Sequence, residues 1–510
     1  MAIVSRLKTS FYKDSVAAMR IAQTVSAAAG LTRVSLLMGT PANKGILAQA
    51  GLLAPGLAAA NPMDMMIVIE GTDQAVEPAL AQIEALLDQQ ETAPASGTVL
   101  AGPRSLALGV DRLRGANLAQ ISVPGPYAAA EALKALRLGL HVFLFSDNVA
   151  LAEERAIKEL AARKNLLVMG PDCGTALIGG IPLGFANAVR RGSIGLVGAS
   201  GTGMQELSCR IHALGEGISH GIGTGSRDAS AEVGGATLLQ GMELLARDPG
   251  TRVIVIVSKP AAPAVAERAL AAARACGKPV VVLFLGSKPA NGGGVHAVAT
   301  LEDAAHAALA LARGQAPGSA GAAAPADAET PAFARSQRYL RGLYSGGTYC
   351  TEALLVWKAA GIPAWSNAPI ADSLQLPRGE PSREHTAIDL GADEFTLGRP
   401  HPMIDFSSRT KRLLREARDP GVAAVVLDVM LGYGAHADPA GELAPAVREA
   451  RAIAAREGRN LLVLGFLCGT EADPQGLTQQ GAKLIEAGMQ LLPNSTAAAR
   501  YAARSVAGRK

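Results

Sequence analysis

The sequence predicts a multi-domain α/β protein with Rossmann-like and flavodoxin-like parallel sheets. From residue 117 onward, short apolar runs alternate with helical stretches, which is typical of parallel strands joined by helical crossovers. Aromatic residues make up 4% of the chain while glycine occurs 57 times, which favours folds in which helices lie close against a sheet. Apolar residues account for 49% of the 510 residues, enough for several buried cores.

Composition shifts divide the chain into four units. VSLLMG (34–39) and MMIVIEG (65–71) are the clearest strands of the first unit, which alternates strands and helices. Linkers rich in Pro, Gly, Ser and Ala follow the first and third units. The predicted boundaries are 1–95, 103–190, 191–314 and 333–510, with the second linker at 315–332.

The charge and cysteine patterns exclude several classes of protein. A formal net charge of +4, scattered along the chain, does not favour nucleic-acid binding. The five cysteines occur singly and form no Cys/His cluster, so we expect neither a metal site nor disulfides, as in a reducing cytosol. The chain has no apolar run of about 18 residues and no signal-peptide core, so we expect a cytoplasmic protein without membrane contact.

Two pairs of segments resemble one another. LVGASGTGMQEL (196–207) and LYSGGTYCTEALL (343–355) each read as a strand, a turn of small and hydroxyl residues, and a helix that carries a glutamate. DPGTRVIVIVSK (248–259) and DPGVAAVVLDVM (419–430) match in the same order. The sequence therefore predicts two related α/β halves.

Each of the two hydroxyl-rich turns is a candidate anion-binding site. The first turn of a helix has unpaired N–H groups and the positive end of the helix dipole, and glycines let a ligand approach the backbone. If the two turns face each other, they can hold the two ends of one small dianion. The alternative is a simple N-cap, for which serine and threonine are favoured. The candidate phosphate- or substrate-binding residues are Ser200, Gly201 and Thr202, and Ser345, Gly346, Gly347 and Thr348.

Lys259 follows an apolar strand and precedes a proline. Ligands of open α/β sheets gather at the carboxyl ends of the strands, where a lysine forms a charge-assisted contact with phosphate. A lysine in this place also commonly points to water, and the sequence leaves both interpretations open.

Several loop motifs resemble succinyl-CoA synthetase. The region 117–313 is similar to the α subunit, and the region 387–505 to the C-terminal domain of the β subunit. The motifs that carry this resemblance are GPDCGT (170–175), GSIGLVGASGTGMQE (192–206), GIGTGSRDAS (221–230), GRPHPMID (398–405), DVMLGYGAHADP (428–439) and FLCGTEADPQ (466–475). Nearly the whole chain resembles the FdrA family, through MGTPANK (38–44), FSDNV (145–149) and VMGPDCGT (168–175). The resemblance implies an α subunit fused to the C-terminal domain of a β subunit, with a CoA-binding-like Rossmann unit at 103–190.

The departures from the synthetase bear on the chemistry. Residues 333–510 leave no room for the nucleotide-grasping domain of the β subunit. The synthetase carries phosphate on a histidine in a loop that here reads SKPANGGGVHAVAT (287–300), where we expect His296 to start the next strand instead. Lys259, or the adjacent Ser258, stands where the synthetase has the glutamate that faces that histidine. We therefore expect no phosphohistidine.

The FdrA resemblance implies a subunit of an oxamate carbamoyltransferase in allantoin breakdown, with carbamoyl phosphate or phosphate as the small-molecule substrate. It implies further subunits as partners, in a hetero- and homo-oligomer. One alternative is an NDP-forming acyl-CoA synthetase-like subunit that lacks the phosphohistidine, and another is a non-catalytic scaffold that senses an acyl phosphate. No cofactor is certain, and CoA or a nucleotide stays a doubtful ligand.

The same resemblance places two histidines in site loops. His401 in GRPHP and His436 in GYGAHAD are candidate catalytic residues with Lys259, able to polarise a carbonyl or move a proton near neutral pH, although a loop histidine is more often solvated. Arg399 is suited to bind a substrate carboxylate. Asp438 is expected to orient its loop or cap a helix. Cys173 is not expected to be a nucleophile, because nothing beside it lowers a thiol pKa.

Overall fold

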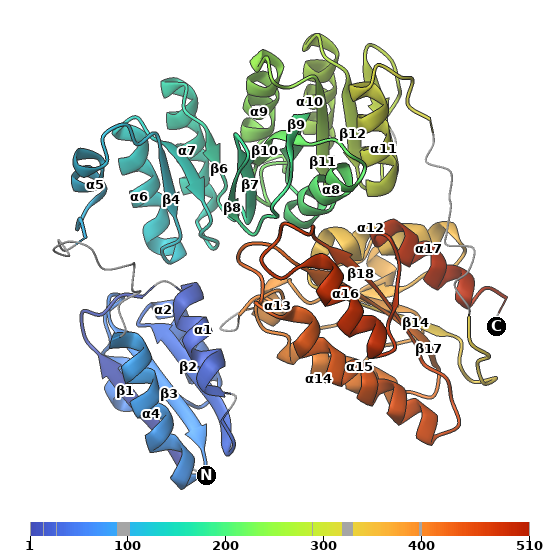
Figure 1. The fold of residues 1–510 in the computed structure, drawn as a ribbon. Coiled ribbons are helices and arrows are strands. Elements are labelled where there is room, and N and C mark those ends of the chain that lie inside the picture. The colour runs from blue at the N-terminus through green and yellow to red at the C-terminus, as the bar shows by residue number, and fades with distance from the viewer. Residues whose placement is uncertain are drawn as a thin grey trace.

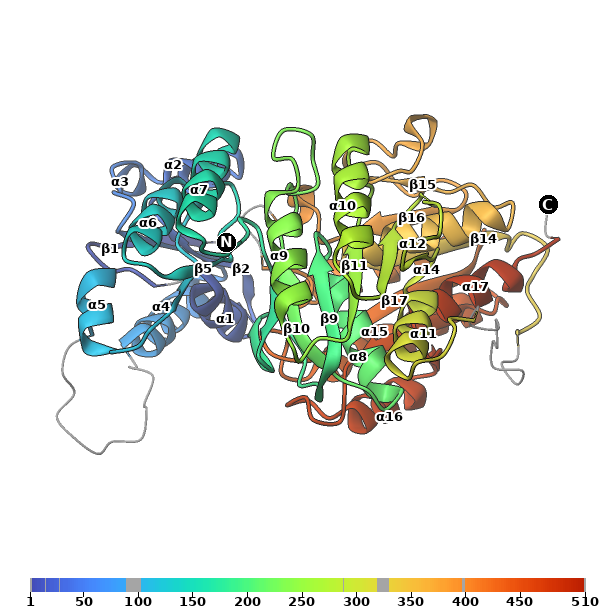
Figure 2. The ribbon, with the colours of Figure 1, turned by 90° about the horizontal axis from the view of Figure 1, so that it is seen from above.

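Four sheets, each with its own helices, follow one another along the chain (Figures 1 and 2). The structure is a computed structural model that describes residues 2–13, 15–26, 28–88, 102–287, 289–318, 330–396 and 400–508. Most of the first linker and residues 319–329 of the second lie outside the described residues.

The N-terminal sheet is wholly antiparallel, whereas the other three sheets are wholly or mainly parallel. Its order is β1-β3-β2, and both outer strands run antiparallel to β3. β1 and β2 are joined by a helix and point the same way, so β3 enters between them from the opposite direction. The elements are β1 Ala2–Lys8, α1 Ser15–Ser26, β2 Leu31–Met38, α2 Pro41–Gln49, α3 Pro55–Ala58, β3 Met65–Gly71 and α4 Asp73–Asp88.

The second sheet is small and parallel, in the order β4-β5-β6. Ala128, Ala132 and Ala135 of α6 are fully buried, and their small side chains let this helix lie close to the sheet. The elements are α5 Leu106–Arg112, β4 Leu118–Ile121, α6 Gly125–Arg137, β5 His141–Leu144, α7 Leu151–Lys164 and β6 Val168–Met169.

The third sheet has the order β13-β12-β11-β9-β10-β7-β8. Its first five strands are parallel, whereas β7 and β8 form an antiparallel edge. The elements are β7 Thr175–Ile178, β8 Ile181–Gly184, β9 Arg191–Gly198, α8 Gly201–Ala213, β10 Ile218–Gly223, α9 Ala236–Arg247, β11 Val253–Ser258, α10 Pro263–Ala275, β12 Val280–Phe284, β13 Val295–Ala297 and α11 Leu301–Ala312.

The fourth sheet is parallel, in the order β15-β16-β14-β17-β18-β19. Every residue of β17 is buried, as expected for a central strand covered on both faces. The elements are β14 Tyr339–Tyr344, α12 Gly347–Ala359, β15 Trp365–Ser366, a 3-10 turn Asp372–Leu374, β16 Thr386–Asp389, α13 Asp393–Thr396, α14 Ser407–Ala417, β17 Val422–Met430, α15 Pro439–Arg456, β18 Leu462–Cys468, α16 Leu477–Glu486, β19 Gln490–Leu491 and α17 Ser495–Ser505.

The two halves predicted from the sequence have the same topology. β9, β10, β11, β12 and β13 take the places in the third sheet that β14, β16, β17, β18 and β19 take in the fourth. The matched segments fall on corresponding strands and helices, because α8 follows β9 as α12 follows β14. The prediction of two related α/β halves is confirmed.

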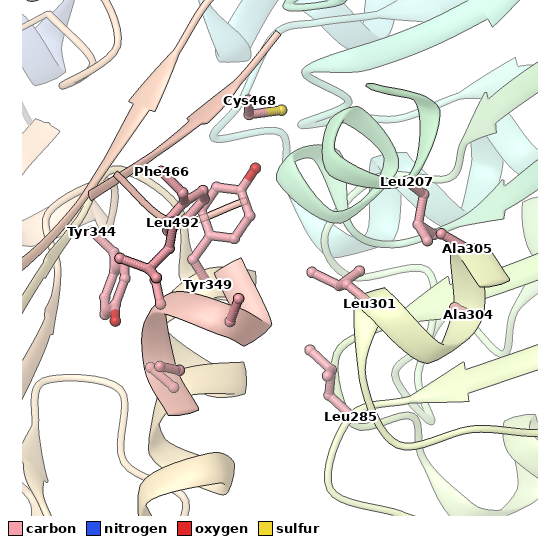
Figure 3. Close-up of a cluster of buried hydrophobic side chains, with 14 of the residues drawn as sticks. Leu207, Leu285, Leu301, Ala304, Ala305, Tyr344, Tyr349, Phe466, Cys468 and Leu492 are labelled. Atoms are coloured by element: carbon pink, nitrogen blue, oxygen red, sulfur yellow. The ribbon is translucent and has the colours of Figure 1, made fainter. Parts of the chain in front are cut away.

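The halves share one hydrophobic core. It contains Leu207 of α8 and Leu301 of α11 from the first half, and Tyr349 of α12 and Phe466 of β18 from the second (Figure 3). The rings of Tyr349 and Phe466 meet edge to face, with centroids 5.0 Å apart. Because this core is continuous across the boundary, the two halves form a single packed unit rather than two domains on a flexible hinge.

Buried polar contacts fix the relative position of the sheets. Asn187, after β8, donates to the Leu431 carbonyl at 3.0 Å and to Asp473 Oδ2 at 2.9 Å, which ties the third sheet to the fourth. Lys158 of α7 forms a buried ion pair with Asp228 at 2.6 Å, which ties the second sheet to the third. The carboxyl ends of β9 and β14 lie close together, because Ser200 and Thr348, in the segments that follow these strands, are in contact.

The structure also bears on the expectations about disulfides and membrane-spanning helices. All five cysteines are free, and Cys209 Sγ lies 3.9 Å from Cys468 Sγ across the boundary between the halves. Among the described residues, no helix combines the length and the apolar character that crossing a membrane requires.

The first prediction concerns Glu206, which is buried at the boundary between the halves. Burial raises the pKa of Glu206 to about 7, although the N–H of Ser495 at 3.3 Å opposes the shift. The folded state therefore retains a proton that the unfolded state loses above the ordinary glutamate pKa. The stability that this proton provides is complete below pH 4.5 and is lost as pH rises through about 7, with a ceiling of about 3 kcal/mol.

Glu206→Gln should therefore melt at nearly the same temperature as the parent at pH 5 and at a higher temperature at pH 8.5. Calorimetric melting curves at both values measure this. Glu243→Gln, a surface variant, serves as the control, since its side chain is 57% exposed. Equal pH dependence in the parent and Glu206→Gln would contradict the assignment.

Candidate functional site

The starts of α8 and α12 abut at the boundary between the halves. We call Ser200–Thr202 and Ser345–Thr348 the two helix starts. Ser200 Oγ lies 2.7 Å from Thr348 Oγ1, and both side chains are buried. A methyl group added at Gly346 would lie 2.4 Å from Thr202 Cγ2, so no larger residue fits there without movement. The two candidate anion-binding sites are therefore adjacent parts of one region.

The hydroxyl groups at the first residues of α8 and α12 do not cap these helices by hydrogen bonding. Ser200 is the N-cap residue of α8, yet its side chain accepts no hydrogen bond from the helix. Gly346 holds that place in α12 and has no side chain to offer. The first residues of the two helices stay accessible, since Gly201 is exposed and Gly347 half-buried. Backbone N–H groups at these glycines are the donors that a ligand can reach.

The second helix start already holds an internal carboxylate. Asp428 Oδ1 accepts a hydrogen bond from the Ser345 N–H at 2.8 Å, and Asp428 Oδ2 accepts one from Ser345 Oγ. Arg409 of α14 pairs with the same carboxylate at 3.2 Å, and Arg409 and Asp428 are both fully buried. Both donors of Ser345, its backbone N–H and its hydroxyl, are therefore taken up by Asp428.

The first half has no counterpart of this carboxylate. Val197 pairs with Ile256 in the third sheet as Leu343 pairs with Leu427 in the fourth, so Val257 occupies the place of Asp428. The N-terminus of α8 therefore lacks the internal anion that the second helix start possesses.

Lys259 lies at the start of α12 rather than at the start of α8. A methyl group added at Gly347 would lie 2.6 Å from both Lys259 Nζ and Asp389 Oδ2. Lys259 is exposed and follows β11 of the first half, whereas Asp389 ends β16 of the second half and is 6% exposed. Strand ends from both halves thus bring a cation and a carboxylate to one helix N-terminus.

His401 borders the same region. A methyl group added at Gly391 would lie 2.9 Å from His401 Nε2 and 3.3 Å from Asp389 Oδ1. His401 Nδ1 accepts from the Met403 N–H at 3.3 Å, so in the neutral ring the proton sits on Nε2. Burial lowers the pKa of His401 to about 4, with Asp428 opposing and Arg409 adding to the shift. At neutral pH this side chain is a hydrogen-bond donor through Nε2.

The N-terminal domain contacts the loop that carries His401. Gln23 of α1 donates a hydrogen bond to the Ile404 carbonyl at 3.3 Å. His436 lies on the other side of this loop, where its backbone N–H donates to the Met403 carbonyl at 2.9 Å and its ring meets Phe406. In the described part of the chain, no hydrogen bond or ring contact joins His436 to Lys259 or to the helix starts.

The remaining sequence candidates have clear places. Asp438 caps α15 and pairs with Lys483 at 2.7 Å, as expected of a structural residue. His296 lies in β13, as expected. Burial raises the pKa of Cys173 to about 12, so it is not a nucleophile. Arg399 lies outside the described residues.

Sequence reasoning missed Asp389, Asp428 and Arg409. Asp389 is the last residue of β16, and Asp428 lies near the end of β17, so the rule that sites form at strand ends points to both. Arg409 carried no such signal, because it lies on an amphipathic helix among other basic residues.

We predict that His401 stays neutral well below the ordinary histidine range. Its imidazole resonances, identified by their loss in His401→Gln, should not titrate between pH 8 and 5.5 in an NMR spectrum of histidine-labelled protein. Free histidine in the same buffer serves as the reference for an ordinary imidazole. A midpoint for His401 near the ordinary value of 6.5 would contradict the burial argument.

The comparisons with known proteins agree with this architecture. Family models match for "AllF, heavy metal-associated domain" at residues 1–101, "CoA binding domain" at 189–286 and "CoA-ligase" at 343–505. No cluster of metal-binding side chains occurs in the residues that the structure describes.

Two relatives found by sequence support the same assignment. The chain is 43% identical over 502 residues to the "Uncharacterized protein YahF" of Escherichia coli K12, with 97% of each chain covered. It is 29% identical over 154 residues to the succinate–CoA ligase [ADP-forming] subunit alpha of Aquifex aeolicus, which covers 28% of this chain and 48% of that subunit. Among solved structures, the apo "dinucleotide forming Acetyl-coenzyme A synthetase 1" of Ca. Korarchaeum cryptofilum matches with a TM-score of 0.32 and 16% identity, over 77% of this chain and 83% of that one. This chain therefore belongs to the family of YahF, as a succinyl-CoA synthetase-like protein with CoA-binding and CoA-ligase domains and an AllF-type N-terminal domain.

Proposed function

We propose that this chain is a subunit of an oxamate carbamoyltransferase, which interconverts carbamoyl phosphate plus oxamate with oxalurate plus phosphate. The observation that carries the proposal is Lys259 at the N-terminus of α12, beside the exposed start of α8. A lysine and two helix N-termini form a site for a small dianion. The match of residues 1–101 to the AllF model supports a place in allantoin breakdown.

The absence of a phosphate-carrying histidine among the described residues of this region favours direct transfer. His296 lies in β13, away from the helix starts, and burial keeps His401 neutral beside the carboxylate of Asp389. In the proposed reaction, the oxamate nitrogen attacks the carbamoyl carbon and loses a proton. The bond from that carbon to the bridging oxygen breaks, and phosphate leaves with the electron pair.

Each group of the site has a role in this proposal. Lys259 and the N–H groups at Gly201 and Gly347 stabilise the charge that develops on the departing phosphate. His401 Nε2–H is suited to donate to the carbamoyl or oxamate oxygen. Ser200 and Thr348 join the two helix starts through their hydroxyl groups, and the Thr202 side chain lies against Gly346. Ser345 is held by Asp428. Other subunits would complete the enzyme.

The second candidate function is that of an acyl-CoA ligase subunit without a phosphohistidine. The matches to the CoA-binding and CoA-ligase models favour it. The two functions differ in their ligands, because the ligase subunit must bind CoA or draw on a nucleotide domain of a partner. A scaffold that senses an acyl phosphate would bind the ligand and support no turnover.

The decisive experiment uses the full chain copurified with the products of its neighbouring genes. We expect release of phosphate from carbamoyl phosphate that depends on oxamate, and no such activity from the chain alone. Turnover of carbamoyl phosphate that requires CoA and ADP, and does not require oxamate, would favour the ligase instead.

Substitutions at the anion-binding region test the same proposal. Lys259→Met and Gly201→Val should each weaken phosphate binding about tenfold or more, which is about 1.4 kcal/mol, because they remove a full charge and obstruct the α8 N-terminus. Calorimetric titration measures this, and melting curves check folding. Lys358→Met, at the exposed far end of α12, is the control. If both variants bind phosphate like the parent, the anion binds elsewhere.

A labelling experiment tests direct transfer. After incubation with ³²P-labelled ATP or acyl phosphate, the chain should carry no acid-labile label, whereas a succinyl-CoA synthetase α subunit treated in parallel should carry it. Stoichiometric label on His296 would exclude direct transfer.

A further inference from the structure

Asp389 is a largely buried side chain, one oxygen of which has no hydrogen-bond partner among the described residues. Asp389 Oδ1 accepts from the Gly391 N–H at 3.0 Å. In the described part of the chain, Oδ2 makes no hydrogen bond or ion pair, although the residue is only 6% exposed. Oδ2 is not fully enclosed, so a ligand that supplies a donor can reach it.

Lys259 Nζ is the second unpaired group at the same point. Like Asp389 Oδ2, it lies 2.6 Å from the position of a methyl group on Gly347, and it makes no hydrogen bond or ion pair among the described residues. The two side chains come from different halves and border Gly347. No hydrogen bond or ion pair joins them among the described residues, but burial raises the pKa of Asp389 and the charge of Lys259 opposes that shift. The site thus offers an ammonium group and a carboxylate oxygen to one small ligand.

The surroundings decide which donor Asp389 takes. Lys259 and the positive end of the α12 dipole already supply positive charge beside this carboxylate. A second cation is therefore disfavoured, whereas a neutral N–H group satisfies Oδ2 without adding charge. A ligand in which an amide nitrogen is attached to an anionic group fits both the carboxylate oxygen and the ammonium group of the site.

We propose that Asp389 is the residue that selects an amide-bearing acyl phosphate, by accepting a hydrogen bond from the ligand N–H while Lys259 binds its phosphate. This inference rests on the proposed function and goes beyond it by assigning the preference to one side chain. Acetyl phosphate, which has a methyl group where carbamoyl phosphate has NH₂, leaves Asp389 Oδ2 unpaired. A site built around a donor discriminates strongly against an analogue that lacks it.

The test compares three ligands by calorimetric titration of the full chain: phosphate, carbamoyl phosphate and acetyl phosphate. The parent should bind carbamoyl phosphate about tenfold or more tightly than acetyl phosphate. Asp389→Asn should bring the two dissociation constants within about threefold. It should bind phosphate no more weakly than the parent, because it removes a negative charge from beside Lys259. Lys259→Met should weaken all three. Asp393→Asn, at a nearby exposed carboxylate, should retain the parent preference.

A second variant keeps the inference testable if Asp389→Asn fails to fold. Gly347→Ala places a methyl group against both Asp389 Oδ2 and Lys259 Nζ, and it should weaken carbamoyl phosphate more than phosphate. An unchanged preference for carbamoyl phosphate over acetyl phosphate in either folded variant would overturn the assignment. So would Mg²⁺ binding to the parent that is lost in Asp389→Asn, since Asp389 would then hold a cation.

Failure of this inference can be distinguished from failure of the proposed function. If the parent shows no preference for carbamoyl phosphate while oxamate still drives phosphate release, the role of Asp389 is wrong and the proposed function stands. If the preference is present and no combination of subunits transfers the group to oxamate, amide recognition stands and the proposed acceptor is wrong.

Discussion

The contact between the two helix starts is the constraint on which the rest of the structure depends. Ser200 Oγ and Thr348 Oγ1 bond across the boundary, and the glycines around them allow the backbones to approach. Two helix N-termini carry like partial charges and repel each other unless other groups compensate. The shared hydrophobic core supplies the packing that holds them together, and Asp428 supplies negative charge at the second helix start.

This arrangement explains why the pseudo-symmetric halves are chemically unequal. The second half carries Asp428, paired with Arg409, where the first half carries Val257. The first half carries Lys259 after β11, and the corresponding place in the second half is Met430. The ammonium group of Lys259 therefore comes from one half and the carboxylate of Asp389 from the other, so the proposed ligand would contact both halves.

The N-terminal domain is connected to the site through its helix α1. Gln23 holds the Ile404 carbonyl, in the loop that also carries His401. This loop in turn meets the loop of His436, so the position of the His401 ring depends on three segments that are distant in sequence. A change in the N-terminal domain thus has a direct physical route to the site.

The sequence by itself determined the fold class, the duplication and the local elements of the site. Alternating apolar runs and the matched segments sufficed, because strand and helix periodicity and glycine-rich turns are local properties. It also placed Lys259 at a strand end and His296 in a strand. Only the tertiary structure decided that Lys259 lies at the start of α12, that Ser345 is held by Asp428, and that Asp389 faces Gly347. These facts depend on how two sheets that are distant in sequence meet, and no local pattern encodes which strand ends become neighbours.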